Sequence, residues 1–227
     1  MIDTIAFDGD DTLWHNESLF SMTQERFRAL LSHAADPADI DRRLLQAERE
    51  NLRVYGYGIK GFVLSMIETA VDLTEGRIAG RDIQSLIDFG KAMLDHPVDL
   101  LDGVADVVEG LSGRYRLLLV TKGDLFDQES KIARSGLAER FSAIEIVSEK
   151  DPDTYRRLLD RHGVDPARFV MVGNSVRSDI LPVLAVGGHA VHVPYHITWA
   201  HEEAEPPSEN YRRIDTLRDL PPLLNAW

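Results

Sequence analysis

The chain has 227 residues, of which 44% are hydrophobic and 28% are charged, proportions typical of a folded protein rather than a disordered one. That length fits one large domain, or one domain with a smaller insert. The formal net charge of −13 argues against binding to nucleic acid or anionic membranes. The absence of cysteine excludes disulfides, Cys-bound zinc and a thiol nucleophile. With no apolar leader or membrane-length run visible, we expect a cytoplasmic protein.

Short apolar runs recur along the chain, and each is bounded by polar, glycine or proline residues. Such runs are typical of the buried strands of a parallel sheet. They cover residues 4–7, 117–120, 144–147, 168–172 and 190–193. Amphipathic segments of helical length cover residues 103–113, 124–136, 152–163 and 177–186. This alternation predicts an α/β fold with a doubly wound, parallel, Rossmann-like sheet. A loop over 205–212, a short strand at Ile214 and a helix over 216–224 are expected to follow.

One long stretch interrupts the alternation, because residues 15–96 contain no strand signal. Four helices are predicted there, over residues 17–33, 37–54, 59–74 and 80–95. Asp36–Pro37 provides a good N-cap and first turn for the second of them. We therefore predict an α/β core domain formed by residues 1–14 and 97–227, with an all-helical insert over residues 15–96.

Polar side chains gather where the predicted strands end. The carboxyl ends of parallel strands lie at one edge of a sheet, which is where such sheets bind ligands. The candidate site residues, in chain order, are Asp8, Asp10, Thr121, Lys122, Lys150, Asn174 and Asp179.

These residue types fit phosphoryl-transfer chemistry. Neighbouring carboxylates can share Mg²⁺, which prefers carboxylate, carbonyl and water oxygens. One carboxylate can attack phosphorus to form an acyl phosphate, and a second can protonate the leaving oxygen and then deprotonate water. A hydroxyl and an ammonium group can hold the phosphoryl oxygens. The bound metal would also let Asp8 approach a phosphate despite their like charges.

The motifs resemble those of the haloacid dehalogenase-like superfamily. The run Asp8-Gly-Asp-Asp-Thr-Leu-Trp14 is similar to its first motif, Asp-x-Asp-x-Thr. Thr121 resembles the second motif, Lys150 the third, and Gly173-Asn-(four residues)-Asp179 the fourth. The helical insert lies where that family has its C1-type cap domain, so the resemblance covers nearly the whole chain.

The resemblance implies a Mg²⁺-dependent phosphatase that acts on a small phosphorylated metabolite. Asp8 would be the nucleophile and a metal ligand, and Asp10 the general acid and base, with its backbone carbonyl on the metal. Thr121 and Lys150 would bind the phosphate and stabilise the aspartyl-phosphate, while Asp179 would bind Mg²⁺ directly or through water. No nucleic-acid or membrane partner is expected, and the oligomeric state is open.

Two positions depart from the family pattern. The fourth motif often begins with Gly-Asp, whereas this chain has Asn174, which still offers a carbonyl oxygen to the metal but one negative charge less. Lys122 stands where the family usually has Asn after the Thr, and we expect its positive charge to help bind an anionic, phosphorylated substrate.

Structural explanations remain open for single residues. Asp8 and Asp10 could be turn residues, Thr121 and Asn174 could cap helices, and Lys150 could be a solvated lysine. The glycine-rich segment 53–60 is a candidate specificity loop or a plain helix–helix turn. The histidines at 189, 192, 196 and 201 follow no zinc-binding spacing and are expected to be solvent or loop residues.

Rival functions also remain open. A phosphosugar mutase would keep the same residues and return the phosphate to the substrate, and a degenerate scaffold would bind phosphate without turnover. A 2-haloacid dehalogenase shares the fold, but such enzymes lack the acid at the position of Asp10 and need no metal. A receiver-type signalling domain would place its phosphorylated Asp on the third strand, where this chain has Lys150.

Overall fold

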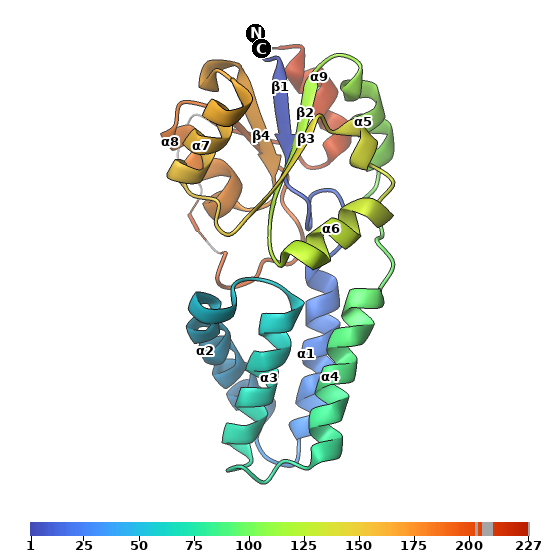
Figure 1. Ribbon diagram of the computed structural model, residues 1–227, viewed down its shortest axis with the longest axis vertical. Coiled ribbons are helices and arrows are strands. Elements are labelled where there is room, and N and C mark those ends of the chain that lie inside the picture. The colour runs from blue at the N-terminus through green and yellow to red at the C-terminus, as the bar shows by residue number, and fades with distance from the viewer. Residues whose placement is uncertain (203, 206–210, 227) are drawn as a thin grey trace. The chain divides into compact units, whose positions relative to one another are not determined.

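The computed structural model describes residues 1–202, 204–205 and 211–226 (Figure 1). The chain divides into two compact units. The α/β unit comprises residues 1–17, 98–122 and 128–227, and the helical unit comprises residues 18–97 and 123–127. The assignment of the helical segment as a C1-type cap domain stays a prediction.

A six-stranded sheet in the order β3-β2-β1-β4-β5-β6 forms the centre of the α/β unit. All of its neighbouring strand pairs are parallel. The strands are β1 (Thr4–Phe7), β2 (Arg116–Lys122), β3 (Ala143–Val147), β4 (Phe169–Gly173), β5 (His189–His192) and β6 (Arg212–Arg213). The predicted α/β fold with a doubly wound parallel sheet is confirmed.

Helices cover both faces of this sheet, as Figure 1 shows for α5 and α9 on one face and α7 and α8 on the other. Successive side chains of a strand point to opposite faces. Ile5 and Phe7 therefore pack in the cluster that includes α5 and α9, and Ala6 packs in the cluster that includes α7 and α8. Phe7 is fully buried, which contributes roughly 1.5–3 kcal/mol for a side chain of this kind. The helices are α5 (Val104–Ser112), α6 (Leu125–Arg134), α7 (Pro152–His162), α8 (Leu181–Ala185) and α9 (Leu220–Leu224).

The helical unit consists mainly of α1 (Glu17–Leu31), α2 (Pro37–Tyr55), α3 (Ile59–Leu73) and α4 (Gly80–Asp95). Its own core includes Phe27, Leu44 and Met66, all with at most 1% of their surface exposed. The Asp36 side chain accepts a hydrogen bond from the Asp39 backbone N–H, as the sequence predicts for the N-cap of α2.

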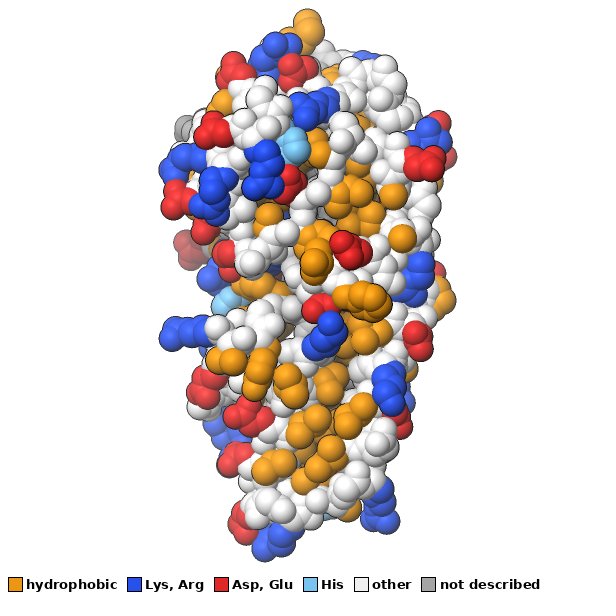
Figure 2. All heavy atoms as spheres, viewed as in Figure 1, with side chains coloured by type: hydrophobic (Ala, Val, Ile, Leu, Met, Phe, Trp, Pro, Cys, Tyr) orange, Lys and Arg blue, Asp and Glu red, His pale blue; other side chains and the backbone are white. Residues whose placement is uncertain are grey.

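The surface of the described chain is mixed in character. Figure 2 shows acidic and basic side chains interspersed on one face of the α/β unit. On the helical unit α3 leaves Leu64 and Val71 exposed. None of the described helices combines the length and the apolar composition that a membrane crossing requires.

Three expected elements differ in detail. The segment expected as one helix over 177–186 is a π-helical turn, η3 (Val176–Ile180), followed by α8, because Pro182 lies in the first turn of α8 and lacks the N–H that a continuous helix would use. The closing helix likewise begins as the 3₁₀ turn η4 (Leu217–Asp219). The short strand expected at Ile214 is β6, one residue earlier, so Arg212 is in a strand and not in the expected loop 205–212. Residues 206–210 of that loop lie outside the described residues.

Candidate active site

Three of the predicted site residues form a buried ionic cluster. The Lys150 ammonium group donates to Asp8 Oδ1 at 2.5 Å and to Asp179 Oδ1 at 2.7 Å. The three residues are only 4%, 7% and 0% exposed, respectively. Burying charged groups costs free energy unless they are paired. Lys150 is therefore not the solvated surface lysine that the sequence left open.

Parallel strands and one glycine bring the cluster together. Asp8 directly follows β1, and its backbone N–H donates to the carbonyl of Val172 in β4. Asp179 lies in η3, and its Oδ2 accepts from the Ser175 backbone N–H at 3.0 Å. A side chain at Gly173 would meet Asp179 Oδ2 at 2.2 Å. Glycine is therefore required at the end of β4 if Asp179 is to reach Lys150.

The protonation of this cluster reflects burial and mutual attraction. Burial raises the pKa of the Asp8 carboxyl, and the Lys150 ammonium opposes that rise. Burial lowers the pKa of Lys150, but the carboxylates of Asp179 and Asp8 more than compensate, so its pKa lies above the ordinary value. Lys150 is therefore a fixed positive charge beside Asp8.

The second carboxylate oxygen of Asp8, Oδ2, lies near other oxygen atoms that could bind a metal. Thr12 Oγ1 lies 3.1 Å from Asp8 Oδ2 and 3.3 Å from Asn174 Oδ1, and it accepts from the Asn174 backbone N–H at 3.0 Å. The carboxylates of Asp8 and Asp179 thus share Lys150, and the amide oxygen of Asn174 shares the Thr12 hydroxyl with Asp8. No group of three or more His, Cys, Asp or Glu side chains suited to a metal was found among the described residues. This donor set fits Mg²⁺, which is bound through one or two carboxylates together with waters and substrate phosphates.

Asp10 has partners outside this ionic cluster. Its Oδ1 accepts from Trp14 Nε1 at 2.7 Å, and its Oδ2 accepts from Gln128 Nε2 at 2.8 Å. Lys131 Nζ lies 3.1 Å from Oδ1 and 3.3 Å from Oδ2. The first motif therefore separates its two acids, with Asp8 beside Lys150 and Asp10 beside α6.

Thr121 and Lys122 end β2 with different surroundings. Thr121 is 1% exposed, and its hydroxyl donates to Gln128 Oε1 at 3.3 Å. Lys122 Nζ donates to Glu202 Oε1 at 2.5 Å and to Ser178 Oγ at 2.9 Å. Glu202 thus balances the charge of Lys122. The expected phosphate-binding role of Lys122 stays a prediction.

Glu202 anchors the segment after β5 to the loop of the fourth motif. Its Oε2 accepts from Ser175 Oγ and from Ser178 Oγ, each at 2.6 Å. Burial raises the pKa of Glu202, but the attraction of Lys122 and the hydrogen bonds from Lys122 and the two serines outweigh it and lower the pKa to about 2. Glu202 is therefore a carboxylate that holds two serines lying between Asn174 and Asp179 in the chain.

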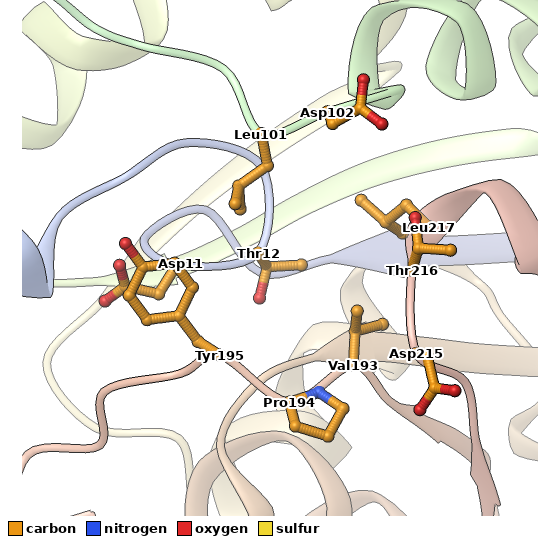
Figure 3. Close-up of a pocket in the computed structure, with 10 residues that line it drawn as sticks. All are labelled: Asp11, Thr12, Leu101, Asp102, Val193, Pro194, Tyr195, Asp215, Thr216 and Leu217. Carbon is orange, nitrogen blue, oxygen red and sulfur yellow. The ribbon is translucent and has the colours of Figure 1, made fainter.

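A separate cavity of about 140 Å³ lies beside the first motif (Figure 3). Asp11, Thr12 and Tyr195 are among its lining residues, whereas Asp8, Lys150 and Asp179 are not. The Asp11 carboxylate accepts from the backbone N–H groups of Asn16 and Glu17 at the start of α1, and burial raises its pKa to about 7. Asp11 thus has a capping role, and we assign no ligand to this cavity.

Two of the histidines considered in the sequence have structural partners. His189 Nε2 lies 3.2 Å from the Ala167 carbonyl oxygen, and His192 Nε2 lies 3.0 Å from the Asn174 carbonyl oxygen. Burial lowers the pKa of His192, which favours its neutral form. Both histidines are end residues of β5 and not loop residues, so that part of the expectation is wrong for these two.

Three residues at the site were missed by the sequence reasoning: Gln128, Lys131 and Glu202. Gln128 and Lys131 are three residues apart and therefore lie on the same side of their helix. That side is otherwise expected to be apolar, so a polar pair there is a signal of a functional role. Glu202 gave no signal, because its partner Lys122 is 80 positions away in the chain.

A haloacid dehalogenase-like hydrolase family model matches residues 2–187 of the chain. The chain belongs to this family. A haloacid dehalogenase-like family hydrolase from Xanthomonas campestris is 45% identical, with a TM-score of 0.89 over 99% of this chain and 91% of that one. The N-acylneuraminate-9-phosphatase of Mus musculus is 27% identical over 207 residues, which is 86% of this chain and 81% of the mouse protein.

The fold of this hydrolase family is shared by enzymes with different chemistry. A 2-haloacid dehalogenase from Pseudomonas syringae has a TM-score of 0.67 at 21% identity, covering the whole of both chains. That likeness shows the fold alone. The chain is an enzyme of the hydrolase family with phosphatases among its relatives, and the choice between reactions depends on the residues of its site.

Proposed function

We propose that the chain is a Mg²⁺-dependent phosphatase that hydrolyses a small phosphorylated metabolite through an aspartyl-phosphate on Asp8. The observation that supports this most is the buried cluster of Asp8, Lys150 and Asp179 at the carboxyl edge of the sheet. A nucleophilic carboxylate, a fixed ammonium and a second carboxylate are the groups this reaction requires.

In the first step the phosphoryl group is transferred from the substrate to Asp8. An oxygen of Asp8 attacks phosphorus while the bond from phosphorus to the ester oxygen breaks. Asp10, in its acid form, gives its proton to that leaving oxygen. Lys150 and the Thr121 hydroxyl stabilise the charge on the phosphoryl oxygens.

The second step restores the enzyme. Asp10, now a carboxylate, takes a proton from water as the water oxygen attacks phosphorus. The bond between Asp8 and phosphorus breaks, and inorganic phosphate leaves. Asp8, Asp179, the Asp10 carbonyl and Asn174 Oδ1 would hold Mg²⁺, which offsets the like charges of Asp8 and the phosphate.

Asp10 distinguishes this proposal from dehalogenation. An acid that gives and takes a proton is needed to expel an alkoxide and to activate water. Three side chains donate to the Asp10 carboxylate, which supports its use in this role. Two relatives of the chain are named N-acylneuraminate-9-phosphatase. These names support including phosphorylated sugars and sugar acids among the substrates tested.

The test is phosphate release from p-nitrophenyl phosphate and from a panel of phosphorylated metabolites, with Mg²⁺ and with EDTA. We expect Mg²⁺-dependent release of inorganic phosphate. A product that keeps its phosphate at a new position would instead indicate a mutase, and no turnover of any compound would contradict the proposal. The cytoplasmic location is likewise a proposal, which fractionation of cells that express the chain would test.

A further inference from the structure

The carboxylate of Asp10 accepts from donors on both of its oxygens. Trp14 Nε1 is 2.7 Å from Oδ1, Gln128 Nε2 is 2.8 Å from Oδ2, and Lys131 Nζ is within 3.3 Å of both. The side chain is 22% exposed, so its orientation depends on these donors rather than on packing alone.

Gln128 differs from the other donors because it contacts two site residues at once. Its amide nitrogen donates to Asp10 Oδ2 and, at 3.3 Å, to the Lys122 carbonyl oxygen, while its amide oxygen accepts from Thr121 Oγ1 at 3.3 Å. Asp10 and the Lys122 carbonyl accept only, so the amide has a single favourable orientation. Gln128 therefore links the side chain that would donate the proton to the hydroxyl that would bind the phosphate.

Gln128 is a polar side chain in a buried position. The residue is 2% exposed, and a buried amide costs free energy unless its hydrogen bonds are made. All of the contacts that satisfy it run to the ends of β1 and β2, where the candidate site lies. A methionine of similar length would fill the same space without needing them.

We propose that Gln128 is a positioning residue that acts through Asp10, setting the direction of its carboxyl group toward the leaving-group oxygen. This inference rests on the proposed phosphatase function. Gln128 does not exchange a proton itself. Its loss leaves Asp10 and Thr121 in place but removes the amide that aligns them.

A positioning role predicts a dependence on the leaving group. p-Nitrophenolate departs as a stable anion and needs little help from an acid, whereas phenolate is a poorer leaving group and needs the proton. The two aryl phosphates have the same ring, so they place similar demands on the rest of the site. kcat/KM reports the steps up to departure of the leaving group, which is where the alignment of Asp10 matters.

The experiment compares wild type, Gln128→Met and Gln128→Glu with both esters in the presence of Mg²⁺. Gln128→Glu is close in shape but offers acceptors where Asp10 needs a donor. General acid–base catalysis contributes about 10²–10⁴-fold, and we expect misalignment to lower kcat/KM for phenyl phosphate by roughly 10- to 100-fold. For p-nitrophenyl phosphate the loss should stay within about threefold. Exposed Glu129 on the same helix provides the control Glu129→Gln, which should leave both values unchanged.

The outcomes distinguish failure of the inference on Gln128 from failure of the proposed phosphatase function. Equal losses on both esters would mean that Gln128 only stabilises the fold or the phosphate contact of Thr121, and they would overturn the inference, as would no loss on either. If wild type released phosphate from neither ester, the proposed function itself would fail. Circular dichroism of each variant identifies misfolding. Should both Gln128 variants misfold, Lys131→Gln tests the positioning of Asp10 from α6, and equal losses on the two esters in that variant would also overturn the inference.

Discussion

Lys150 and Lys122 lie near the ends of neighbouring strands, and the sequence predicts the same phosphate-binding role for both. Their surroundings differ. Lys150 lies between the carboxylates of Asp8 and Asp179, two residues of the candidate site. Lys122 lies against Glu202, which also accepts from Ser175 and Ser178. Lys150 contacts Asp8, the proposed nucleophile, while Lys122 and Glu202 hold the loop that leads to Asp179.

The partner of a buried charge therefore decides what that charge does in the molecule. A lysine with a catalytic carboxylate as partner can transfer its attraction to a phosphoryl group when substrate binds. A lysine whose partner is a carboxylate used by no reaction step stabilises the fold. The variants below test whether this division between the two lysines is correct.

The largest effect is expected for Asp8→Asn, which removes the nucleophile while keeping its shape. Turnover should fall by roughly 10⁴-fold or more, and Asp10→Asn should approach that loss. Phosphate release from p-nitrophenyl phosphate with Mg²⁺ is the measurement. Asp160→Asn, at an exposed position of α7, is the matched control. Substantial turnover by Asp8→Asn would contradict the mechanism.

Replacing each lysine by methionine separates their roles directly. Lys150→Met should lower kcat by roughly 10²- to 10³-fold, as expected when a group that stabilises transition-state charge is lost. Lys122→Met should keep kcat within about tenfold but lower the midpoint of urea unfolding, because Glu202 is left buried without its cation.

The same pair of variants tests the sequence-based expectation for Lys122. If that ammonium contacts the phosphate, Lys122→Met raises KM for p-nitrophenyl phosphate by more than about tenfold. Steady-state kinetics at saturating Mg²⁺ decides between these outcomes. A rise in KM without a loss of stability would remove the contrast between the two lysines.

Glu202→Gln probes the structural side of the comparison through its dependence on pH. The pKa of Glu202 is lowered from 4.5 to about 2 in the folded protein. The stabilisation is therefore fully present above pH 4.5 and is lost as the pH falls toward 2. At pH 7 the variant should be less stable by about 2–3 kcal/mol, and this gap should shrink at pH 3.

Urea unfolding of wild type and Glu202→Gln at the two pH values measures that gap. Glu205→Gln, at an exposed position of the same segment, is the control and should match wild type. A gap of equal size at both pH values would show that Glu202 stabilises the loop by its shape rather than by its charge.

The sequence predicts the sheet and its helices well because each element is decided locally. The run Thr4–Phe7 is apolar and buried on both faces, and Asp36–Pro37 marks the start of α2. Elements with conflicting local signals were less predictable. Pro182 divides the segment expected as one helix into η3 and α8.

The candidate site is predictable only as far as it lies at strand ends. Asp8, Asp179 and Lys150 meet because parallel strands end at one edge of the sheet. The contacts of Glu202 depend instead on the path of a loop, which no local pattern encodes. For Gln128 the local pattern shows a polar position on a helix, but it does not show that the partner of that side chain is Asp10. The roles themselves remain predictions for the variants to test.

The smallest effect is expected at Asn174, beside the cluster that contains Lys150. Asn174→Asp adds a negative charge near Asp8 and Asp179, since Asn174 Oδ1 shares the Thr12 hydroxyl with Asp8 Oδ2. Without a cation this charge is repelled by two buried carboxylates, so the variant should melt at a lower temperature. With Mg²⁺ the extra carboxylate should bind the ion roughly three- to tenfold more tightly.

A ligand stabilises the state that binds it, so Mg²⁺ raises the melting temperature of the folded protein. Lower stability without Mg²⁺ and tighter Mg²⁺ binding should both make this rise larger in Asn174→Asp than in wild type. Thermal melts of wild type and Asn174→Asp with and without MgCl₂ measure this directly and need no substrate. An equal increase in both proteins would place Asn174 away from the metal. The ion would then be held by Asp8, Asp179 and the Asp10 carbonyl. The loop held by Lys122 and Glu202 would serve only to position Asp179.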